Sequence, residues 1–538
     1  MKRILTLIIA VLMVVGVSMI AVSCGDEPTP SGTTAAPVAT TKANEPTATE
    51  ENTSGGTPVA TAEPTSEATQ GGTTPATPTG TTSGGGTTPS GDGYSKPEGY
   101  LDVDFGGRVF TFVTTNDEDV GYQTAWQIES ESRTGGTIVN TAIYDRNQVL
   151  KRLYNCEIKA IMGDATALIA NDVNSGTNEY DFGSKQYLWF RTDNKNGYYI
   201  NLYDLDLDMS IDGWNKTLFE QLTVRDKNGV DKLYTLDADF NLTTFGCTWV
   251  LFCNLDLYNQ NFTESIFDIV KKGEWTMDKM MEMISAVAQD NGDQVWKGGE
   301  DIFGLMTTSH NAFGLITSGG IRTVSYDADH NLQTSVEQIL SGDAIGVIDK
   351  AAQLCSMDGV YIGSYTINQD SFIAGKSLFI GEVMQYANDR LSKVDNINAT
   401  IIPEPLYSSE TQDKYTFYVN NKASTYLVSK NACGGDKKMI ADFLNVLVYH
   451  SNKIVYPEFL KHYGQVCCND ERTVDMLKIV TQGVVYDFSY YGAGGTVMGQ
   501  IAEMIHSGKN QLNRAANSLQ KTLQNALNTY VDDMTASD

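Results

Sequence analysis

Aromatic side chains stand beside carboxylates and amides at several points of this chain, after its predicted early strands and near its middle. An aromatic ring offers a flat apolar face, while carboxylates and amides hydrogen-bond to hydroxyl groups, so together they suit a polyhydroxylated ring such as a sugar. The candidates of this kind are Asp117, Glu118, Trp126, Tyr187, Trp189, Trp249, Glu382, Gln385 and Tyr415. Any one of them alone is more often a packed ring or a solvated acid, but as a set we expect some to share one cleft.

Catalytic chemistry has less support in the sequence. No metal-ligand spacing links the five histidines, which are His310, His330, His450, His462 and His506. The Gly-Lys-Ser at Gly375 to Ser377 resembles the end of a phosphate-binding loop, but Asp370 stands where its first glycine belongs. The acidic turn Asp290 to Asp293 lacks the rest of a calcium loop. We therefore expect no catalytic residue, no metal site, no cofactor and no enzymatic activity.

One residue near the start suggests a covalent modification. Cys24 follows Ala21, Val22 and Ser23, at the end of an apolar run behind the basic pair Lys2 and Arg3. This pattern is typical of a signal peptide, residues 1–23, and it resembles the bacterial lipobox, in which the cysteine thiol receives a diacylglycerol. The alternative is a membrane-spanning anchor over Ile4 to Val22. Both interpretations place the rest of the chain outside the cell.

Residues 24–95 consist mainly of Thr, Pro, Gly, Ser and Ala, with almost no large apolar side chain. Such a segment cannot bury enough surface to offset its chain entropy, so we expect a disordered tether. The remaining chain, 96–538, is too long for one ordinary core and predicts two lobes. The formal net charge of −28 argues against nucleic acid and anionic membrane surfaces as partners.

The remaining seven cysteines do not describe a disulfide scaffold. Cys247 and Cys253 share one apolar strand, too far apart to bridge, and we interpret them as buried small hydrophobes. Cys467 and Cys468 are adjacent, where a strained vicinal disulfide is possible but simple packing is the better interpretation.

The elements that would position the candidate residues alternate between strand and helix. RVFTFV at 108–113, a helix over 137–154 and an alternating strand at 156–161 predict a βαβ unit at the start of the domain. Thr276 is placed to cap a helix with a buried methionine stripe. Further helices are expected from Met439 and, as one apolar stripe, from 501 to 530. Further strands are expected at 181–183, 232–236, 250–253, 377–380, 400–402 and 425–428.

An ordered set of segments resembles a known family. The segments are NTAIYDRNQVLKRLYNCEI, INLYDLDLDMSIDGWNK, DKLYTLDADF, VLFCNLDLYNQ, KKGEWTMDKMMEM, FIAGKSLFIGEV and IIPEPLYSSETQDKY. In this order they look like the extracellular solute-binding proteins of ABC importers, the family that includes maltose-binding-type receptors. Cys253 and Glu404 stand where that family often has other residues, which affects the ligand rather than the fold.

The resemblance implies an α/β fold of two lobes joined by crossing hinge strands, the type II periplasmic-binding-protein fold. Lobe 1 would hold about 100–240 and 423–455, and lobe 2 about 241–422 plus the C-terminal helices of 456–538. Gly319 and Gly320 resemble the family's Gly-Gly turn and join the candidate ligand-binding residues.

The implied function is capture of a carbohydrate, most often an oligosaccharide, by hinge closure and its delivery to ABC permease subunits. The protein would be a monomer, held at the extracellular face of the cell membrane by the lipid on Cys24. A surface glycan-binding lipoprotein without a transport role needs the same cleft and tether and remains an alternative. A glycoside hydrolase, which needs two carboxylates at a fixed separation, is a weaker one.

Overall fold

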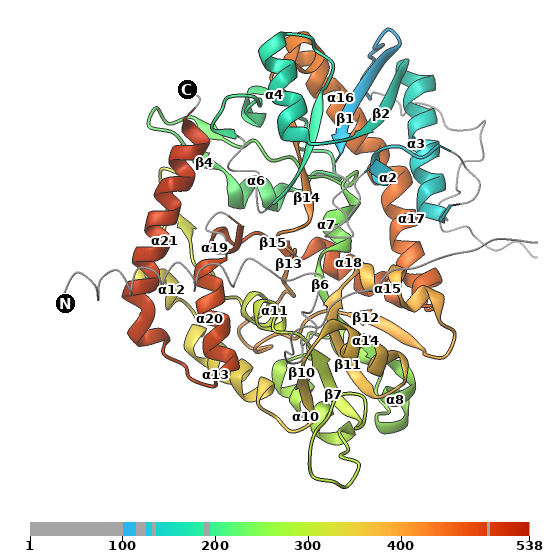
Figure 1. Cartoon of the computed structure of the whole chain (residues 1–538), viewed down its shortest axis with the longest axis vertical. Coiled ribbons are helices and arrows are strands. Elements are labelled where there is room, and N and C mark those ends of the chain that lie inside the picture. Colours follow the sequence, from blue (N-terminus) through green and yellow to red (C-terminus); the bar gives the residue numbers. More distant parts are fainter. Residues whose placement is uncertain (1–99, 115–124, 132–135, 188–193, 492–494, 537–538) are drawn as a thin grey trace, which may run out of the picture. The chain divides into compact units, whose positions relative to one another are not determined.

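The computed structural model describes residues 100–114, 125–131, 136–187, 194–491 and 495–536, which lie in the compact unit Pro89–Asp538. The signal peptide, Cys24 and the tether lie outside the described residues, as does the alternative anchor. Within the described part, no helix has the length and apolar character needed to cross a membrane. The chain forms a mixed α/β fold of two lobes, each built on its own sheet (Figure 1).

Lobe 1 is built on a four-stranded sheet with the order β14-β3-β1-β2. Strands β1, β2 and β3 are parallel, and β14 joins the edge antiparallel to β3. Phe112 and Phe182 stack at 4.4 Å, and Phe443 of α16 packs against both rings. The elements of this lobe are β1 (Arg108–Thr114), α2 (Ala125–Ile128), α3 (Ile138–Tyr154), β2 (Cys156–Met162), α4 (Ala165–Ser175), β3 (Phe182–Gln186), η1 (Leu202–Asp204), α6 (Lys216–Leu222), β4 (Val224–Arg225), β5 (Asp231–Lys232), β14 (Ser424–Val428), η3 (Ala432–Gly435) and α16 (Lys437–His450).

Lobe 2 is built on a five-stranded sheet with the order β10-β7-β11-β6-β12. Strand β6 runs antiparallel to both of its neighbours, whereas β7, β10 and β11 are parallel. Its elements are β6 (Trp249–Asn254), α8 (Leu255–Asn261), α9 (Ile266–Lys271), α10 (Met277–Val287), β7 (Phe303–Thr307), α11 (Asn311–Ser318), β8 (Ser325–Tyr326), β9 (Leu332–Gln333), α12 (Val336–Ile339), α13 (Ala344–Cys355), β10 (Val360–Ile362), α14 (Tyr365–Ile373), β11 (Ser377–Val383), α15 (Gln385–Asp389), η2 (Leu391–Lys393) and β12 (Ala399–Ile402).

Two crossing segments connect the lobes and pair with each other. The first passes through α7 (Leu242–Gly246) into β6, and the second passes from β13 (Phe417–Tyr418) into β14. Thr248 and Val419 form an antiparallel bridge, and the amide of Asn420 donates to the carbonyl of Cys247 at 3.0 Å. Because the two segments are hydrogen-bonded to each other, they form one paired connection between the lobes.

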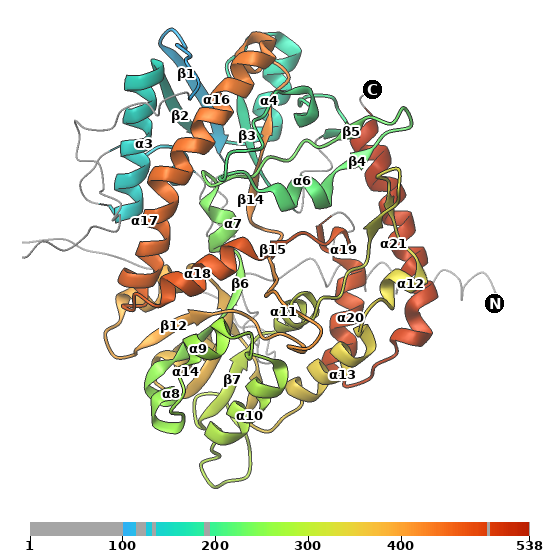
Figure 2. The same cartoon turned by 180° about the vertical axis from the view of Figure 1, so that it is seen from behind.

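The C-terminal region follows β14 and contacts both lobes. A helical run from α16 continues through two π-helical segments, and α20 packs against α11, α13 and α21 (Figure 2). Helix α21 contacts α12 and also β4 of lobe 1. The remaining elements are η4 (Ser451–Val455), α17 (Tyr456–Lys461), η5 (His462–Cys467), α18 (Thr473–Gln482), β15 (Val484–Val485), α19 (Phe488–Tyr491), α20 (Thr496–His506) and α21 (Leu512–Thr535).

Two of the predicted elements differ from the structure. The strand expected over 232–236 is reduced to β5, because the amide of Leu233 donates to the side chain of Asn201 instead of to a neighbouring strand. The single stripe expected over 501–530 is two helices, since Gly508 turns the chain at φ +63° and its amide donates to the carbonyl of Ile505.

Candidate functional site

A series of aromatic rings runs along the crossing segments from lobe 1 to lobe 2, and we call it the aromatic seam. Tyr187, which follows β3, lies 5.6 Å from the ring of Tyr491. The contacts continue from Tyr491 to Tyr490 at 5.0 Å, from Tyr490 to Tyr418 at 5.4 Å and from Tyr418 to Trp249 at 6.1 Å. His310, directly after β7, ends the series at 6.0 Å from Trp249. The seam therefore joins the carboxyl ends of β3 and β7, where α/β sheets commonly bind ligands.

The lobe 2 end of the seam keeps some solvent access. Trp249 is only 1% exposed, since its ring lies against Tyr418 and His310. His310, Phe313 and Tyr365 are half-buried, and the Tyr365 hydroxyl lies 3.3 Å from Nδ1 of His310. Burial lowers the pKa of His310, so its ring is neutral at pH 7. This end therefore offers neutral, partly exposed rings with hydrogen-bonding atoms at their edges.

A carboxyl group lies near the same edge of the sheet. Glu382 on β11 pairs with Val250, next to Trp249, and accepts a hydrogen bond of 2.8 Å from Nε2 of Gln369. Arg390 in turn donates to Oε1 of Gln369 at 3.0 Å. Burial raises the pKa of Glu382 to about 7, so the group exchanges a proton near neutral pH.

A second buried acid, Glu404, lies next to Trp249 of the seam. Its side chain is 1% exposed, and neither carboxyl oxygen has a hydrogen-bond partner in the described residues. Burial raises its pKa to about 8, and the indole N–H of Trp249 offsets this only in part because the two groups do not reach good hydrogen-bond geometry. Glu404 is therefore mainly protonated at pH 7, and it lies under α11, close to Gly314.

A polar network lies at the lobe 1 end of the seam. The carboxylate of Asp237 accepts four hydrogen bonds: 2.6 Å from Asn215, 2.7 Å from Asn241, 3.0 Å from Thr244 and 3.1 Å from the Tyr486 hydroxyl. Burial raises its pKa to about 6, and the four donors limit that rise. Since Asn241 and Thr244 lead into the first crossing and Tyr486 comes from the C-terminal region, Asp237 fixes where these segments meet.

The residues beside β15 hold both lobes. The amide of Tyr486 donates to the side chain of Gln221 in lobe 1 at 2.6 Å, while Asp487 accepts from the amide and hydroxyl of Thr323 in lobe 2 at 3.0 and 2.7 Å. The Tyr491 hydroxyl accepts from the amide of Val419 at 3.0 Å and donates to its carbonyl at 2.6 Å, on the second crossing.

The structure brings only some of the predicted residues together. Tyr187 and Trp249 are members of the seam, and Glu382 lies on the strand next to Trp249. Trp126 is half-buried on α2. The predicted residues Asp117, Glu118 and Trp189 lie outside the described residues.

The other predicted residues make local contacts. Gln385 accepts from the Tyr463 hydroxyl at 2.7 Å and donates to Asp389 at 3.0 Å. Tyr415 is 8% exposed and donates to the carbonyl of Val270 at 3.1 Å. Gly319 caps α11, and Gly320 has φ +80°, a backbone conformation that favours glycine.

Sequence reasoning missed several members of the seam. Tyr418, Tyr490, Tyr491 and His310 are absent from the candidate ligand-binding residues that the sequence suggests. A signal existed for His310, because Thr-Ser-His follows the buried run of β7 and so lies at the carboxyl end of a parallel strand. No local signal marked the tyrosines, since their position depends on the pairing of β13 with β15.

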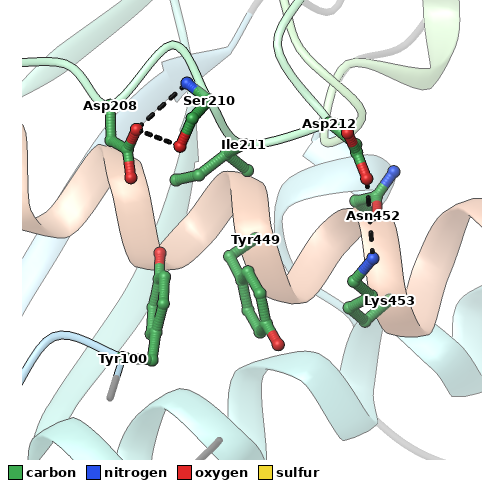
Figure 3. A pocket seen from close by; sticks show the side chains of 8 residues that line it. All are labelled: Tyr100, Asp208, Ser210, Ile211, Asp212, Tyr449, Asn452 and Lys453. Carbon is green, nitrogen blue, oxygen red and sulfur yellow. Dashed lines mark hydrogen bonds and ion pairs between the residues drawn. The ribbon is translucent and has the colours of Figure 1, made fainter.

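A separate pocket of about 230 Å³ lies on lobe 1 and contains none of the predicted residues (Figure 3). The rings of Tyr100 and Tyr449 stack on each other at 4.2 Å, so their facing surfaces are covered. Asp208 accepts from Ser210, and Asp212 lies 3.9 Å from the Lys453 amine. Because these groups are already bound to one another, we place the candidate site at the seam.

No cluster of three or more His, Cys, Asp or Glu side chains suited to a metal ion occurs among the described residues. The seven cysteines from Cys156 to Cys468 are free thiols, and six of them are buried. Burial raises the pKa of Cys467 to about 12, so its thiol stays protonated although His462 lies 3.5 Å away.

Comparison with known proteins supports the fold. Neither a family model nor a curated protein matches the sequence. Among solved structures, a cyclo/maltodextrin-binding protein complexed with maltotetraose matches with a TM-score of 0.50 at 12% identity, over 78% of this chain and 96% of that chain.

Two further structures are similar at lower scores. The galacto-N-biose/lacto-N-biose I-binding protein of the ABC transporter from Bifidobacterium longum matches with a TM-score of 0.46 at 13% identity, over 79% of this chain and 98% of that chain. An ABC substrate-binding protein from Listeria monocytogenes, in complex with cycloalternan, matches with a TM-score of 0.45 at 12% identity, over 78% of this chain and 99% of that chain. At such identities the likeness establishes the fold alone.

Proposed function

We propose that this protein is an extracellular solute-binding receptor that captures a carbohydrate, most often an oligosaccharide, between its two lobes and delivers it to an ABC permease. The observation that carries the proposal is the aromatic seam, which passes from β3 to β7 along the crossings and ends beside the half-buried rings of His310, Phe313 and Tyr365. Aromatic rings pack against the apolar face of a sugar, and polar side chains at their edges hydrogen-bond to its hydroxyl groups.

Ligand capture would proceed by closure of the lobes about the crossing segments. A sugar ring would lie against Tyr365 and His310 of lobe 2, with Trp126 of α2 supplying a lobe 1 contact. A ligand that contacts one lobe equally well in the open and closed states does not shift the equilibrium between them. The ligand therefore stabilises the closed state only if it contacts both lobes. No covalent chemistry is needed at any step.

Replacing Tyr365 by alanine is expected to weaken oligosaccharide binding by about 1 to 2 kcal/mol, or about 5- to 30-fold in Kd, because an aromatic face is lost from the site. Isothermal titration calorimetry measures the change, with maltotetraose as the first probe and a panel of other oligosaccharides after it. The matched control is Tyr203→Ala, which removes a 46% exposed tyrosine on η1 of lobe 1, outside the aromatic seam, and should leave Kd unchanged. Equal affinities for the two variants would contradict the placement of the site.

Membrane attachment is proposed to depend on Cys24, and Cys24→Ser is expected to abolish the lipid anchor because serine has no thiol to acylate. Wild type should fractionate with membranes, and mass spectrometry should find a diacylglyceryl cysteine as its first residue. The variant should be unprocessed or shed. Wild-type protein that retains Met1 in the membrane fraction would instead favour the spanning anchor over Ile4 to Val22.

A further inference from the structure

Helix α2 is a four-residue element whose neighbouring side chains have different environments. Trp126 is half-buried, whereas Gln127 is fully buried. The helix is the next described element after the carboxyl end of β1, which lies at the same edge of the sheet as the end of β3 before Tyr187. A buried amide must satisfy its donors and acceptors inside the protein, and the partners of Gln127 therefore show what α2 is attached to.

Those partners lie on both crossings. Nε2 of Gln127 donates to Oδ1 of Asn241 at 3.0 Å and to the Tyr426 hydroxyl at 2.8 Å, and its Oε1 accepts from the amide of Thr243 at 3.0 Å. Asn241 and Thr243 begin the first crossing at α7, and Tyr426 lies on β14, which the second crossing enters. One side chain thus joins α2 to the lobe 1 ends of both connections.

Asn241 extends this attachment between the crossings themselves. Its Nδ2 donates to the carbonyl of Ser424 at 2.6 Å and to Asp237 at 2.7 Å, and the side chain is fully buried. The amides of Gln127 and Asn241 therefore form one continuous set of short hydrogen bonds. Because hydrogen bonds weaken steeply as they lengthen and bend, none of these groups can shift alone.

The backbone of α2 is held from the other side by a buried cation. Nη2 of Arg146 donates to the carbonyl of Ile128 at 2.7 Å, and its Nη1 lies 3.3 Å from the Ser451 hydroxyl at the start of η4. Arg146 is fully buried, and its burial lowers its pKa to about 9. Helix α2 is therefore fixed to α3 and η4 as well as to the crossings.

We propose that Gln127 is a positioning residue that makes α2 and the lobe 1 ends of both crossings move as one body when the lobes change their separation. The inference rests on the proposed function, since it explains how a ligand contact at α2 would bias lobe closure. A ligand that touches Trp126 then acts on the hinge directly, because Gln127 on the same helix holds both crossings.

The test measures the distance between the lobes in the full chain. Spin labels are attached to Asn171→Cys on α4 and Ser285→Cys on α10, both exposed positions. The protein without these substitutions reports background labelling of the native thiols. Pulsed electron resonance is recorded without ligand for three backgrounds: wild type, Gln127→Met and Asn201→Leu.

Asn201→Leu is the matched control, because Asn201 is a buried amide whose partners, Asp231, Leu233 and Tyr203, all lie in lobe 1. Both substitutions remove three hydrogen bonds and are expected to lower Tm by a few degrees. Only Gln127→Met is expected to broaden the distribution of distances between the lobes. The inference is wrong if Gln127→Met leaves the distribution unchanged, or if Asn201→Leu broadens it equally.

If Gln127→Met does not fold, Gln127→Glu carries the test. The glutamate keeps the acceptor for Thr243 but presents an oxygen instead of an N–H to Asn241, so an intermediate broadening is expected, and an unchanged width overturns the inference. Maltotetraose is then added to wild type as a separate step. A failure of sugars to shift the wild-type distance counts against the proposed function, whereas the ligand-free comparison alone decides the role of Gln127.

Discussion

Asp237→Ala is expected to destabilise the protein by about 3 to 5 kcal/mol, one of the largest effects of any single polar substitution in the chain. The carboxylate is 2% exposed and is the shared acceptor of Asn215, Asn241, Thr244 and Tyr486. Its removal leaves four donors facing a small cavity. An unpaired buried polar group costs about 1 to 3 kcal/mol, so the loss exceeds that of a simple truncation even if the side chains rearrange.

Urea unfolding at pH 7, followed by intrinsic fluorescence, measures this loss of stability. The control is Asp206→Ala, because Asp206 is exposed and its bond to Asn445 is made by the backbone carbonyl, which the substitution keeps. Its substitution should change stability by no more than about 0.5 kcal/mol. A loss of less than about 1 kcal/mol for Asp237→Ala would mean that the network does not hold the crossings together.

The secondary structure was predicted best where its determinants are local. Thr276 caps α10 by accepting from the amide of Lys279, as expected from a threonine before a methionine stripe. The first βαβ unit was predicted nearly to the residue as β1, α3 and β2, because the strands are short apolar runs and the helix has one apolar stripe. The two-lobed fold followed from the resemblance, and the structure confirms the fold class.

Prediction failed where a side chain from elsewhere decided the backbone. The run 232–236 alternates between apolar and polar residues, but Asn201 takes the amide that a strand would use, so the ladder breaks after Lys232 and resumes only as one bridge between Leu236 and Tyr426. The sequence of five residues does not show that the amide of Leu233 will bond to a side chain instead of to a neighbouring strand. In the C-terminal tail, Gly508 was overlooked as a breaker because the apolar spacing on both of its sides suits one long helix.

The candidate site divides in the same way. Tyr187 and Trp249 were selected because each adjoins a predicted strand, and both belong to the seam. Tyr491 is separated from Tyr187 by some three hundred residues, and only the C-terminal region's return to the crossings brings them together. Residue type can suggest that an aromatic ring binds a ligand, but long-range pairing decides which rings meet.

Glu404→Gln is expected to stabilise the protein at alkaline pH while leaving it almost unchanged in acid. The carboxyl of Glu404 is buried without a hydrogen-bond donor of good geometry, and its pKa is raised to about 8 from an ordinary value of 4.5. A raised pKa means that the folded protein favours the protonated acid. The associated stability is fully present below pH 4.5 and is lost as the pH rises through 8. Glutamine has the shape of the protonated acid but cannot ionise.

Other buried groups shape the pH profile of the wild type. Burial raises the pKa of Glu382 and Asp239 to about 7 and that of Asp237 to about 6. Ionisation of these acids therefore also lowers the stability of the folded protein as the pH rises. His450 acts in the opposite direction, because burial lowers its pKa from 6.5 to about 4. The stability that the folded protein gains from neutral His450 is lost as the pH falls below 6.5. Because four raised acids outweigh one lowered histidine, we expect these groups together to make wild-type stability fall as the pH rises from about 5 toward 9.

The comparison that isolates Glu404 is the unfolding free energy of wild type and Glu404→Gln between pH 5 and pH 9. The variant should gain on the order of 3 to 4 kcal/mol over wild type at pH 9, relative to their difference at pH 5, because one pKa unit corresponds to about 1.4 kcal/mol. Glu410→Gln is the control, since Glu410 is exposed and should give a profile parallel to wild type. If the Glu404→Gln profile were also parallel, the carboxyl would have to be ionised without penalty, and a donor or solvent would have to reach it behind Trp249. The buried acid would then be part of the open ligand site rather than of the core beneath it.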